Sequence, residues 1–171
     1  SFYQLSLDSK VTLFYCHIID NPMEINEKEI MEYYCFNGFM GKTRMRMKFL
    51  RSWILHTMAY SSPHSGFTAN IQRSRGVKIG KNCHFSPYVL LDLVYPHLVN
   101  IGNNVTFGSN VMVFAHNNPA ANLFLKNGEF PRKVEKVDIK SGAVLFPGSI
   151  ITAGVTNVSY TPLTLPTIYP V

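Results

Sequence analysis

Histidine is the residue type in this sequence best suited to proton transfer at neutral pH, because its imidazole has an ordinary pKa near 6.5. A neutral imidazole can accept the proton of a hydroxyl group and so turn an alcohol into a nucleophile. His116 stands out among the six histidines because an excursion rich in Asn and Pro, residues 117–135, follows it directly. Segments that leave a rigid scaffold often carry function. His116 is therefore the candidate general base; the alternatives are a residue chosen only for its backbone conformation and a tolerated surface insertion after it.

The composition indicates one folded domain. The chain has 171 residues, of which 46% are hydrophobic and 15% charged, too apolar a balance for a disordered protein. Three cysteines favour free thiols and a reducing compartment. There is neither a run of about 18 to 20 apolar residues that would span a membrane nor a visible signal peptide. We therefore expect a cytoplasmic protein.

The net charge of +6 is unevenly distributed along the chain. Between Lys42 and Leu91 there are nine Lys or Arg and no Asp or Glu. Such a stretch suits an anionic lipid, a nucleic acid or a phosphorylated ligand, and it also suits an ordinary solvated face. The aromatic interleaving and motifs of a nucleic-acid-binding protein are missing, so no nucleic-acid partner is expected.

From Val77 to Val155 the sequence has a period of six residues. The repeated aliphatic or aromatic positions are Ile79, Phe85, Leu91, Ile101, Phe107, Val113, Ile139, Leu145 and Ile151. A second, mostly small apolar series lies two residues before each of them. A six-residue period matches neither the 3.6-residue turn of an α-helix nor a heptad, and the hairpin turns of a β-sandwich are absent.

The positions three residues after each repeated apolar residue indicate corners. They are Asn82, Tyr88, Val94, Asn104, Asn110, His116, Gly142, Gly148 and Gly154, and six of the nine are Asn or Gly. Asn and Gly are the residues that most readily adopt a positive φ. Three hexads would make one circuit of a three-sided coil, and the segments 77–94, 99–116 and 137–155 would stack at about 4.8 Å. The predicted fold class is an all-β core, a parallel β-helix of about three coils over residues 77–155, with the excursion 117–135 as a loop.

Residues 42–60 predict an N-terminal amphipathic helix. Its apolar stripe consists of Phe49, Leu50, Trp53, Ile54 and Met58, with Arg44, Lys48 and Arg51 largely off it. The apolar face could cap the open end of the β-helix, which is the simpler interpretation, or rest on an anionic membrane surface. Residues 1–41 form a weakly defined segment with a faint helical signal around residues 27–36, and Met31 or Met47 would be a natural start.

Residues 76–156 resemble the hexapeptide-repeat acyltransferases, and most of all the O-acetyltransferases that modify sugars and cell-surface polysaccharides. Three runs carry the resemblance: RGVKIGKN (75–82), VNIGNNVTFGSNVMVFAHN (99–117) and VDIKSGAVLFPGSIITAGVT (137–156). It implies a left-handed β-helix, an exception to the usual right-handed crossover. It also implies a homotrimer that binds acetyl-CoA in the groove between neighbouring β-helices. No metal is expected, because zinc-dependent members carry two histidines five residues apart and this sequence has no such pair.

The same resemblance implies roles for five residues. His116 matches the catalytic histidine that deprotonates the acceptor hydroxyl for direct transfer from acetyl-CoA. Asp92 lies near an acidic residue that contacts the acceptor sugar, with a solvated turn residue as the alternative. Ser86 stands at a substrate-binding position where members close to the galactoside enzymes have Asn, which argues against that type of oligosaccharide. Phe146 and Pro147 occupy positions that touch the pantetheine arm of the cofactor.

The expected function is therefore an acetyl-CoA-dependent O-acetyltransferase acting on a sugar or cell-surface polysaccharide precursor. The alternatives are a non-catalytic β-helix scaffold or binding module, and an inactive truncated fragment. The fragment alternative arises because residues 156–171, TNVSYTPLTLPTIYPV, lack the further hexads of the family. Their prolines do not suit a ladder of strands, and the run also resembles translated adapter sequence.

Overall fold

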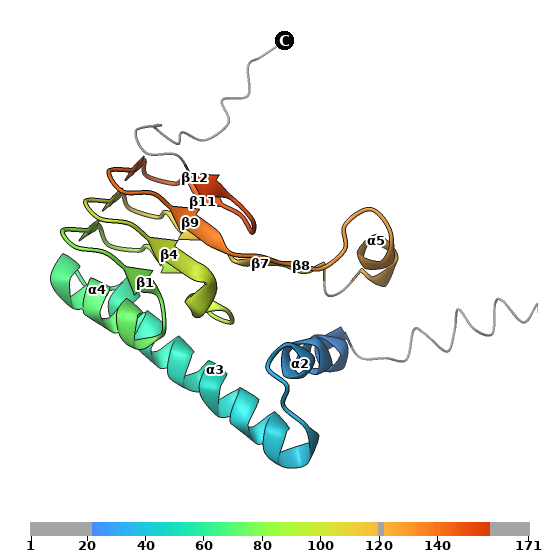
Figure 1. Ribbon diagram of the computed structural model, residues 1–171. Coiled ribbons are helices and arrows are strands. Elements are labelled where there is room, and N and C mark those ends of the chain that lie inside the picture. The colour runs from blue at the N-terminus through green and yellow to red at the C-terminus, as the bar shows by residue number, and fades with distance from the viewer. Residues whose placement is uncertain (1–21, 120–121, 158–171) are drawn as a thin grey trace, which may run out of the picture.

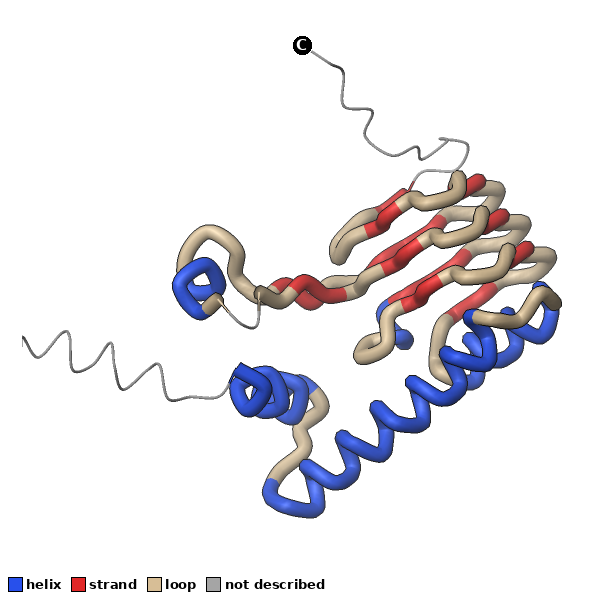
Figure 2. The backbone as a smooth tube through the Cα atoms, turned by 180° about the vertical axis from the view of Figure 1, so that it is seen from behind, coloured by secondary structure: helices blue, strands red, loops and turns tan. Residues whose placement is uncertain are grey.

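The computed structural model describes residues 22–119 and 122–157. Three helices come first: α2 (Pro22–Tyr33), α3 (Gly38–Tyr60) and α4 (Ser65–Ser74). A stack of short strands follows. Helices α3 and α4 lie along one end of the stack, and α2 lies beyond the start of α3, on the side of the projecting excursion (Figures 1 and 2). The segment 1–21 and most of the predicted tail, residues 158–171, lie outside the described residues.

Three short parallel sheets form the walls of a tube. The first wall has the order β1 (Lys78–Ile79), β4 (Val99–Ile101), β9 (Val137–Ile139) and β12 (Thr156–Asn157). The second wall consists of β2 (His84–Phe85), β5 (Thr106–Phe107) and β10 (Val144–Leu145). The third consists of β3 (Leu90–Leu91), β6 (Met112–Val113) and β11 (Ile150–Ile151). Strands that follow one another in the chain thus lie on different walls, which confirms the predicted parallel β-helix; the direction in which it winds stays a prediction.

The hexad residues stack on one another inside the tube. Ile79 is in register with Ile101, Phe85 with Phe107, and Leu91 with Val113, one pair on each wall. The rings of Phe85 and Phe107 are parallel, with centroids 4.6 Å apart. Eight of the nine repeated apolar residues are buried and Ile79 is partly buried. The six-residue period therefore fills one continuous core.

The predicted corners turn through positive φ at seven of the nine positions: Asn82, Tyr88, Asn104, Asn110, Gly142, Gly148 and Gly154. The two exceptions are Val94 and His116. After Val94 the chain enters a 3₁₀ helix, η1 (Pro96–Leu98), and at His116 it starts β7 (His116–Asn117). Both exceptions are points where the chain leaves the coil, so His116 is not a corner residue chosen for its backbone conformation.

The excursion after His116 has structure of its own. β7 pairs in antiparallel fashion with β8 (Lys133–Val134), and α5 (Leu123–Asn127) lies between them in the chain. Figure 1 shows this ribbon and helix projecting from the side of the tube. The chain then re-enters the first wall at β9, and β12 extends that wall two residues past the predicted end of the coil at residue 155.

α4, which the sequence pattern did not predict, covers the open end of the first coil. Arg73 donates to the carbonyl oxygens of Ile79 and Gly80 at 3.2 and 2.7 Å. The Ser65 hydroxyl accepts from the backbone N–H of Phe85 at 2.8 Å. These bonds satisfy edge groups that would otherwise be left unpaired.

α3 runs beside α4, and it begins at Gly38 instead of residue 42. The side it turns toward the rest of the molecule is largely small or polar, and its buried residues are Gly41, Met45, Ser52, His56 and Ala59. The predicted apolar stripe does not cap the coil: Leu50, Trp53, Ile54 and Met58 are each 45 to 49% exposed. Capping thus depends on the opposite face of this helix and on α4.

The corners give a direct test of the fold. Asn110 has a φ of 59° and an exposed side chain, and Asn110→Val would force a β-branched residue into that conformation. We expect the free energy of unfolding, measured by urea denaturation, to fall by roughly 1–2 kcal/mol. Asn110→Gly, the matched control, should leave it nearly unchanged. Equal effects of the two substitutions would contradict this account of the corners.

Candidate active site

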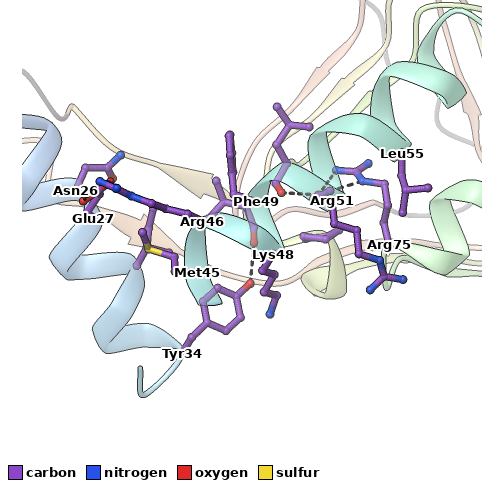
Figure 3. A pocket seen from close by; sticks show the side chains of 15 residues that line it. Asn26, Glu27, Tyr34, Met45, Arg46, Lys48, Phe49, Arg51, Leu55 and Arg75 are labelled. Carbon is purple, nitrogen blue, oxygen red and sulfur yellow. Dashed lines mark hydrogen bonds and ion pairs between the residues drawn. The ribbon is translucent and has the colours of Figure 1, made fainter. Parts of the chain in front are cut away.

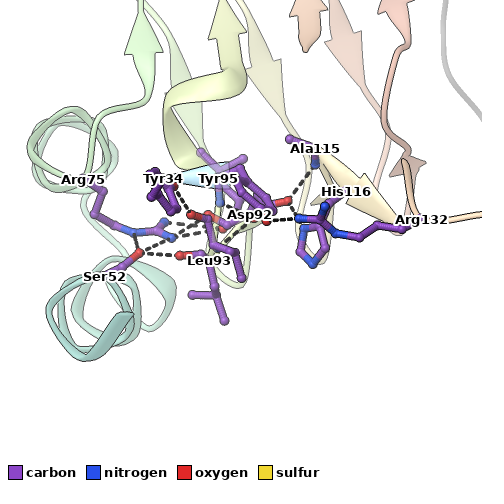
Figure 4. A network of polar contacts seen from close by, with 11 residues as sticks. Tyr34, Ser52, Arg75, Asp92, Leu93, Tyr95, Ala115, His116 and Arg132 are labelled. Carbon is purple, nitrogen blue, oxygen red and sulfur yellow. Dashed lines mark hydrogen bonds and ion pairs between the residues drawn. The ribbon is translucent and has the colours of Figure 1, made fainter. Parts of the chain in front are cut away.

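Asp92 and His116 meet where the third wall ends. Asp92 follows β3, and its backbone N–H donates to the carbonyl oxygen of Val113 in β6 at 2.9 Å. This bond aligns Asp92 with the residues that lead into β7. The Oδ2 atom of Asp92 consequently lies 2.6 Å from the Nδ1 atom of His116 (Figure 4).

The Asp92 carboxylate is completely enclosed. Its side chain is 0% exposed, and three backbone N–H groups donate to it, those of Val94, Tyr95 and Ala115, each at 2.8 Å. Burial alone would raise the pKa of Asp92, but the hydrogen bond and charge of His116 and the N–H groups of Tyr95 and Ala115 outweigh it and hold the pKa below its usual value. Asp92 is therefore an ionised acceptor at neutral pH and not a solvated turn residue.

This carboxylate determines which nitrogen of His116 carries the proton. An ionised carboxylate can only accept, so Nδ1–H donates to Asp92 and Nε2 keeps its lone pair. The His116 side chain is 27% exposed. The edge of the Tyr95 ring packs against the imidazole, with centroids 5.3 Å apart. An imidazole oriented by a buried carboxylate, with Nε2 toward solvent, is the geometry of a general base.

Arg75 holds the backbone of Asp92 and so supports the Asp92–His116 pair, called the dyad below. It is 9% exposed, and its guanidinium donates to the backbone carbonyl oxygen of Asp92 at 2.7 Å. Its other partners are Ser52 Oγ, His56 Nδ1, Gln72 Oε1 and the carbonyl oxygen of Leu91. Burial lowers the pKa of Arg75 to about 10, partly opposed by the charge of Asp92, so the side chain stays charged at neutral pH. Arg75 thus joins α3 and α4 to the residue that orients His116.

His56 is neutral in this network. Burial, together with the charge of Arg75, lowers the pKa of His56 to about 4. At neutral pH its Nδ1 atom can therefore accept from the Arg75 guanidinium, 3.2 Å away. Protonation of His56 would place two cations in contact within a buried site.

α2 and the excursion form the other side of the site. Glu29 of α2 forms ion pairs with Lys126 of α5 and with Arg132. Arg132 also donates to the hydroxyl of Tyr95, the residue that packs on His116. A hollow of about 570 Å³ starts at Asn117, beside His116, and is lined by residues of the excursion, Arg132 among them. Its lining includes polar and charged side chains.

A second pocket lies on the far side of Asp92. It has a volume of about 290 Å³ and lies between α2, α3 and the segment that follows Asp92 (Figure 3). Lys48, Arg51 and Arg75 are among its lining residues, but the His116 imidazole is not. His116 is not among the lining residues of the hollow beside the excursion either, but that lining begins at Asn117, the next residue in the chain.

The other candidate residues from the sequence lie at a different edge of the tube. Ser86 follows β2, and Phe146 and Pro147 follow β10, so all three lie between the second and third walls. Phe146 is 43% exposed and Pro147 is also exposed. Within one chain, the third wall separates them from His116, a span of roughly six residues at about 3.3 Å each. The structure therefore brings together Asp92 and His116 and does not bring the other three to them.

Three residues of the site were not singled out by the sequence: Arg75, Tyr95 and Glu29. The partners of Arg75 include backbone carbonyl groups, which every residue has, so no sequence pattern indicates them. Glu29 meets residues about a hundred positions away in an excursion without periodicity. Within residues 22–119 and 122–157, no group of three His, Cys, Asp or Glu side chains gathers to hold a metal ion.

The fold resembles that of solved acetyltransferases. A hexapeptide-repeat-containing acetyltransferase from Vibrio cholerae aligns with 66% of this chain and 73% of its own, at 13% identity and a TM-score of 0.51. The same protein complexed with acetyl coenzyme A aligns with 65% of this chain and 69% of its own, at 14% identity and a TM-score of 0.49. A galactoside acetyltransferase in complex with coenzyme A aligns with 67% and 74%, at 20% identity and a TM-score of 0.40.

The first of these similarities, with a TM-score of 0.51, confirms the resemblance to a hexapeptide-repeat acetyltransferase at the level of the fold, because an identity of 13% shows no more than that. The sequence itself matches no model of a known protein family and no curated protein.

The buried histidine predicts how stability depends on pH. The pKa of His56 in the folded protein, about 4, is below its ordinary value of 6.5. Its contribution to stability is therefore complete above about pH 6.5 and is lost as the pH falls toward 4. Between about pH 7 and pH 5 this group alone should lower the free energy of unfolding by about 2 kcal/mol.

His56→Gln keeps an acceptor for Arg75 but cannot titrate, so its free energy of unfolding should fall less over this range than that of the wild type. Urea denaturation at the two pH values measures both. The same pH dependence in variant and wild type would show that His56 does not titrate as the structure requires.

Proposed function

We propose that this protein is an acetyl-CoA-dependent O-acetyltransferase that acts on a hydroxyl group of a sugar or cell-surface polysaccharide precursor. The observation that carries the proposal is the buried Asp92 carboxylate bonded to His116, at the point where the coil opens into the excursion. The fold shared with a hexapeptide-repeat acetyltransferase supports the choice of an acetyl donor.

The proposed reaction is a direct transfer. Nε2 of His116 takes the proton of the acceptor hydroxyl while the hydroxyl oxygen attacks the thioester carbonyl carbon. The tetrahedral intermediate then collapses, and the carbon–sulfur bond breaks. The thioester sulfur takes the proton from Nε2 and leaves as the thiol of coenzyme A. His116 thereby returns to its starting state, and the acetyl group is bonded to the acceptor oxygen.

Asp92 is proposed as a positioning residue and not as a contact of the acceptor. The resemblance implied a contact with the sugar, but the side chain is 0% exposed and both of its oxygens are already engaged by backbone N–H groups and His116. Its negative charge would stabilise the imidazolium that forms when Nε2 takes the proton. It would also keep the ring in the tautomer that leaves Nε2 available.

A homotrimer would complete the site. Phe146 and Pro147, the residues proposed to touch the pantetheine arm, lie one wall away from His116 in the same chain. In a closed ring of three tubes, each His116 edge could face the Phe146 edge of a neighbour, so that acetyl-CoA would lie between two chains. Ser86 lies at this second edge and would face the same groove.

The alternative of a non-catalytic scaffold explains the tube but not the dyad. The backbone N–H groups of Val94, Tyr95 and Ala115 would be enough to pair a purely structural carboxylate, so a scaffold does not require the further bond to His116. The open Nε2 of an imidazole held by such a carboxylate is what proton transfer needs.

The direct test is release of coenzyme A thiol from acetyl-CoA in the presence of a panel of sugars. We expect His116→Ala to lower kcat by about 10²- to 10⁴-fold, as loss of a general base does. His84→Ala is the matched control, because His84 is an exposed histidine on β2, on a different wall. A loss of less than about tenfold in the His116 variant would argue against the proposed base.

Subunit mixing tests the shared site. His116→Ala and Phe146→Asp should each be nearly inactive alone, because each removes one half of every site. Random heterotrimers refolded from equal amounts should regain about one quarter of wild-type activity, since that share of interfaces joins two intact halves. No recovery in mixtures shown to exchange subunits would mean that each site lies within one chain.

A further inference from the structure

The face of α3 that points away from the rest of the molecule is strongly apolar. Its exposed side chains are Phe39, Met40, Met47, Leu50, Trp53, Ile54 and Met58, between 45 and 83% accessible. At 100° per residue these positions fall on one side of the helix, opposite the buried Met45, Ser52 and His56. The face extends over about 20 residues, or roughly 30 Å. Thr43 and Arg46 interrupt the face between Met40 and Met47, and the apolar residues from Met47 to Met58 form its longer part. This many exposed large apolar side chains on one helix face are unusual on a protein that stays alone in water.

The charged side chains that α3 itself carries are all cations. α3 carries Lys42, Arg44, Arg46, Lys48 and Arg51 and contains no Asp or Glu. Glu27 of α2 pairs with Lys42 and Arg46. Among the described carboxylates, none forms an ion pair with Arg44 or Arg51, which flank the other edge of the apolar face. Arg51 donates to the carbonyl oxygen of Ser74 at 3.3 Å, and the Arg44 guanidinium lies 5.8 Å from the centroid of the Phe36 ring. Neither positive charge is therefore neutralised by a described carboxylate.

The charge pattern decides between the possible occupants. A second copy of α3 laid against the first would bring two rows of cations together, which is unfavourable. An anionic bilayer surface offers both an apolar layer for the exposed side chains and phosphate groups for the flanking arginines. Within the described part of the chain, no helix is long and apolar enough to cross a membrane. The helix would thus lie in the plane of the interface.

We propose that the exposed face of α3 binds the surface of anionic phospholipid bilayers. The apolar side chains from Phe39 to Met58 would enter the boundary between headgroups and acyl chains, and Arg44 and Arg51 would contact lipid phosphates. This inference goes beyond the proposed acetyl transfer and does not depend on it.

The chain contains a single tryptophan, Trp53, and it lies on this face. Its fluorescence therefore reports directly on the proposed contact. The full chain is mixed with vesicles of phosphatidylglycerol and phosphatidylcholine in equal parts, or of phosphatidylcholine alone. We expect co-sedimentation and a blue shift of Trp53 emission with the first and little of either with the second, and we expect added salt to weaken the binding.

Two pairs of variants separate this face from the rest of the surface. Leu50→Glu with Ile54→Glu should lower the bound fraction at least about tenfold, whereas Val144→Glu with Ile150→Glu, exposed aliphatic residues on the β-helix, should not. Arg44→Gln with Arg51→Gln should weaken binding more than Lys78→Gln with Lys81→Gln, two exposed cations of the first coil.

Binding that survives in the α3 variants, or co-sedimentation without any change in Trp53 emission, would overturn the proposal. A different pair of results would also overturn it. Trp53 emission would stay unchanged with both vesicle types, and the Leu50→Glu, Ile54→Glu substitutions would dissociate an oligomer in sedimentation equilibrium. In that case the face is a contact between copies of this chain.

Discussion

The enclosed carboxylate of Asp92 is the interaction on which the candidate site depends. Removing a carboxylate from water costs several kcal/mol unless its oxygens are fully bonded. Here the N–H groups of Val94 and Tyr95 come from its own coil, while Ala115 and His116 come from the next one. The carboxylate is therefore satisfied only when two successive coils are stacked in the correct register. The six-residue repeat that builds the tube also builds the dyad.

The helices belong to the same construction. Arg75 bonds the carbonyl oxygen of Asp92 on one side and Ser52 of α3 on the other. Tyr34, the residue after α2, donates to the carbonyl oxygen of Val94 at 2.6 Å, two residues after Asp92. The turn that presents Asp92 is thus held between the coil and the helical cap. As a consequence, Ser52 and His56 on the buried face of α3 make hydrogen bonds to Arg75. The apolar face of α3 is exposed, and it is the face proposed to bind a bilayer.

The sequence predicted the parts of the fold that repeat. Nine apolar positions and seven corners followed from the six-residue period, because each coil needs a buried apolar residue and a residue of positive φ at the same positions of the repeat. His116 was also predictable, since it stands where that period is interrupted. The role of the neighbouring carboxylate was harder to see: Asp92 resembles a turn residue until the next coil is laid on top of it.

The non-repeating parts could not be predicted in the same way. A hydrophobic stripe normally marks the buried face of a helix. For α3 this expectation predicted the wrong buried face, because Ser52 and His56 on the opposite side are buried by a hydrogen-bond network around Arg75. Such networks involve partners far apart in the chain and backbone atoms that every residue has. Glu29 and the excursion residues it pairs with lack a pattern for the same reason.

The protonation of the His116 ring tests the central claim most directly. In the full chain labelled with ¹⁵N-histidine, NMR at neutral pH should show the His116 ring protonated at Nδ1 and bare at Nε2, and Asp92→Asn should disturb that state. A ring protonated at Nε2, or one that exchanges between the two tautomers as freely as an exposed histidine, would mean that Asp92 does not prepare His116 to act as a base.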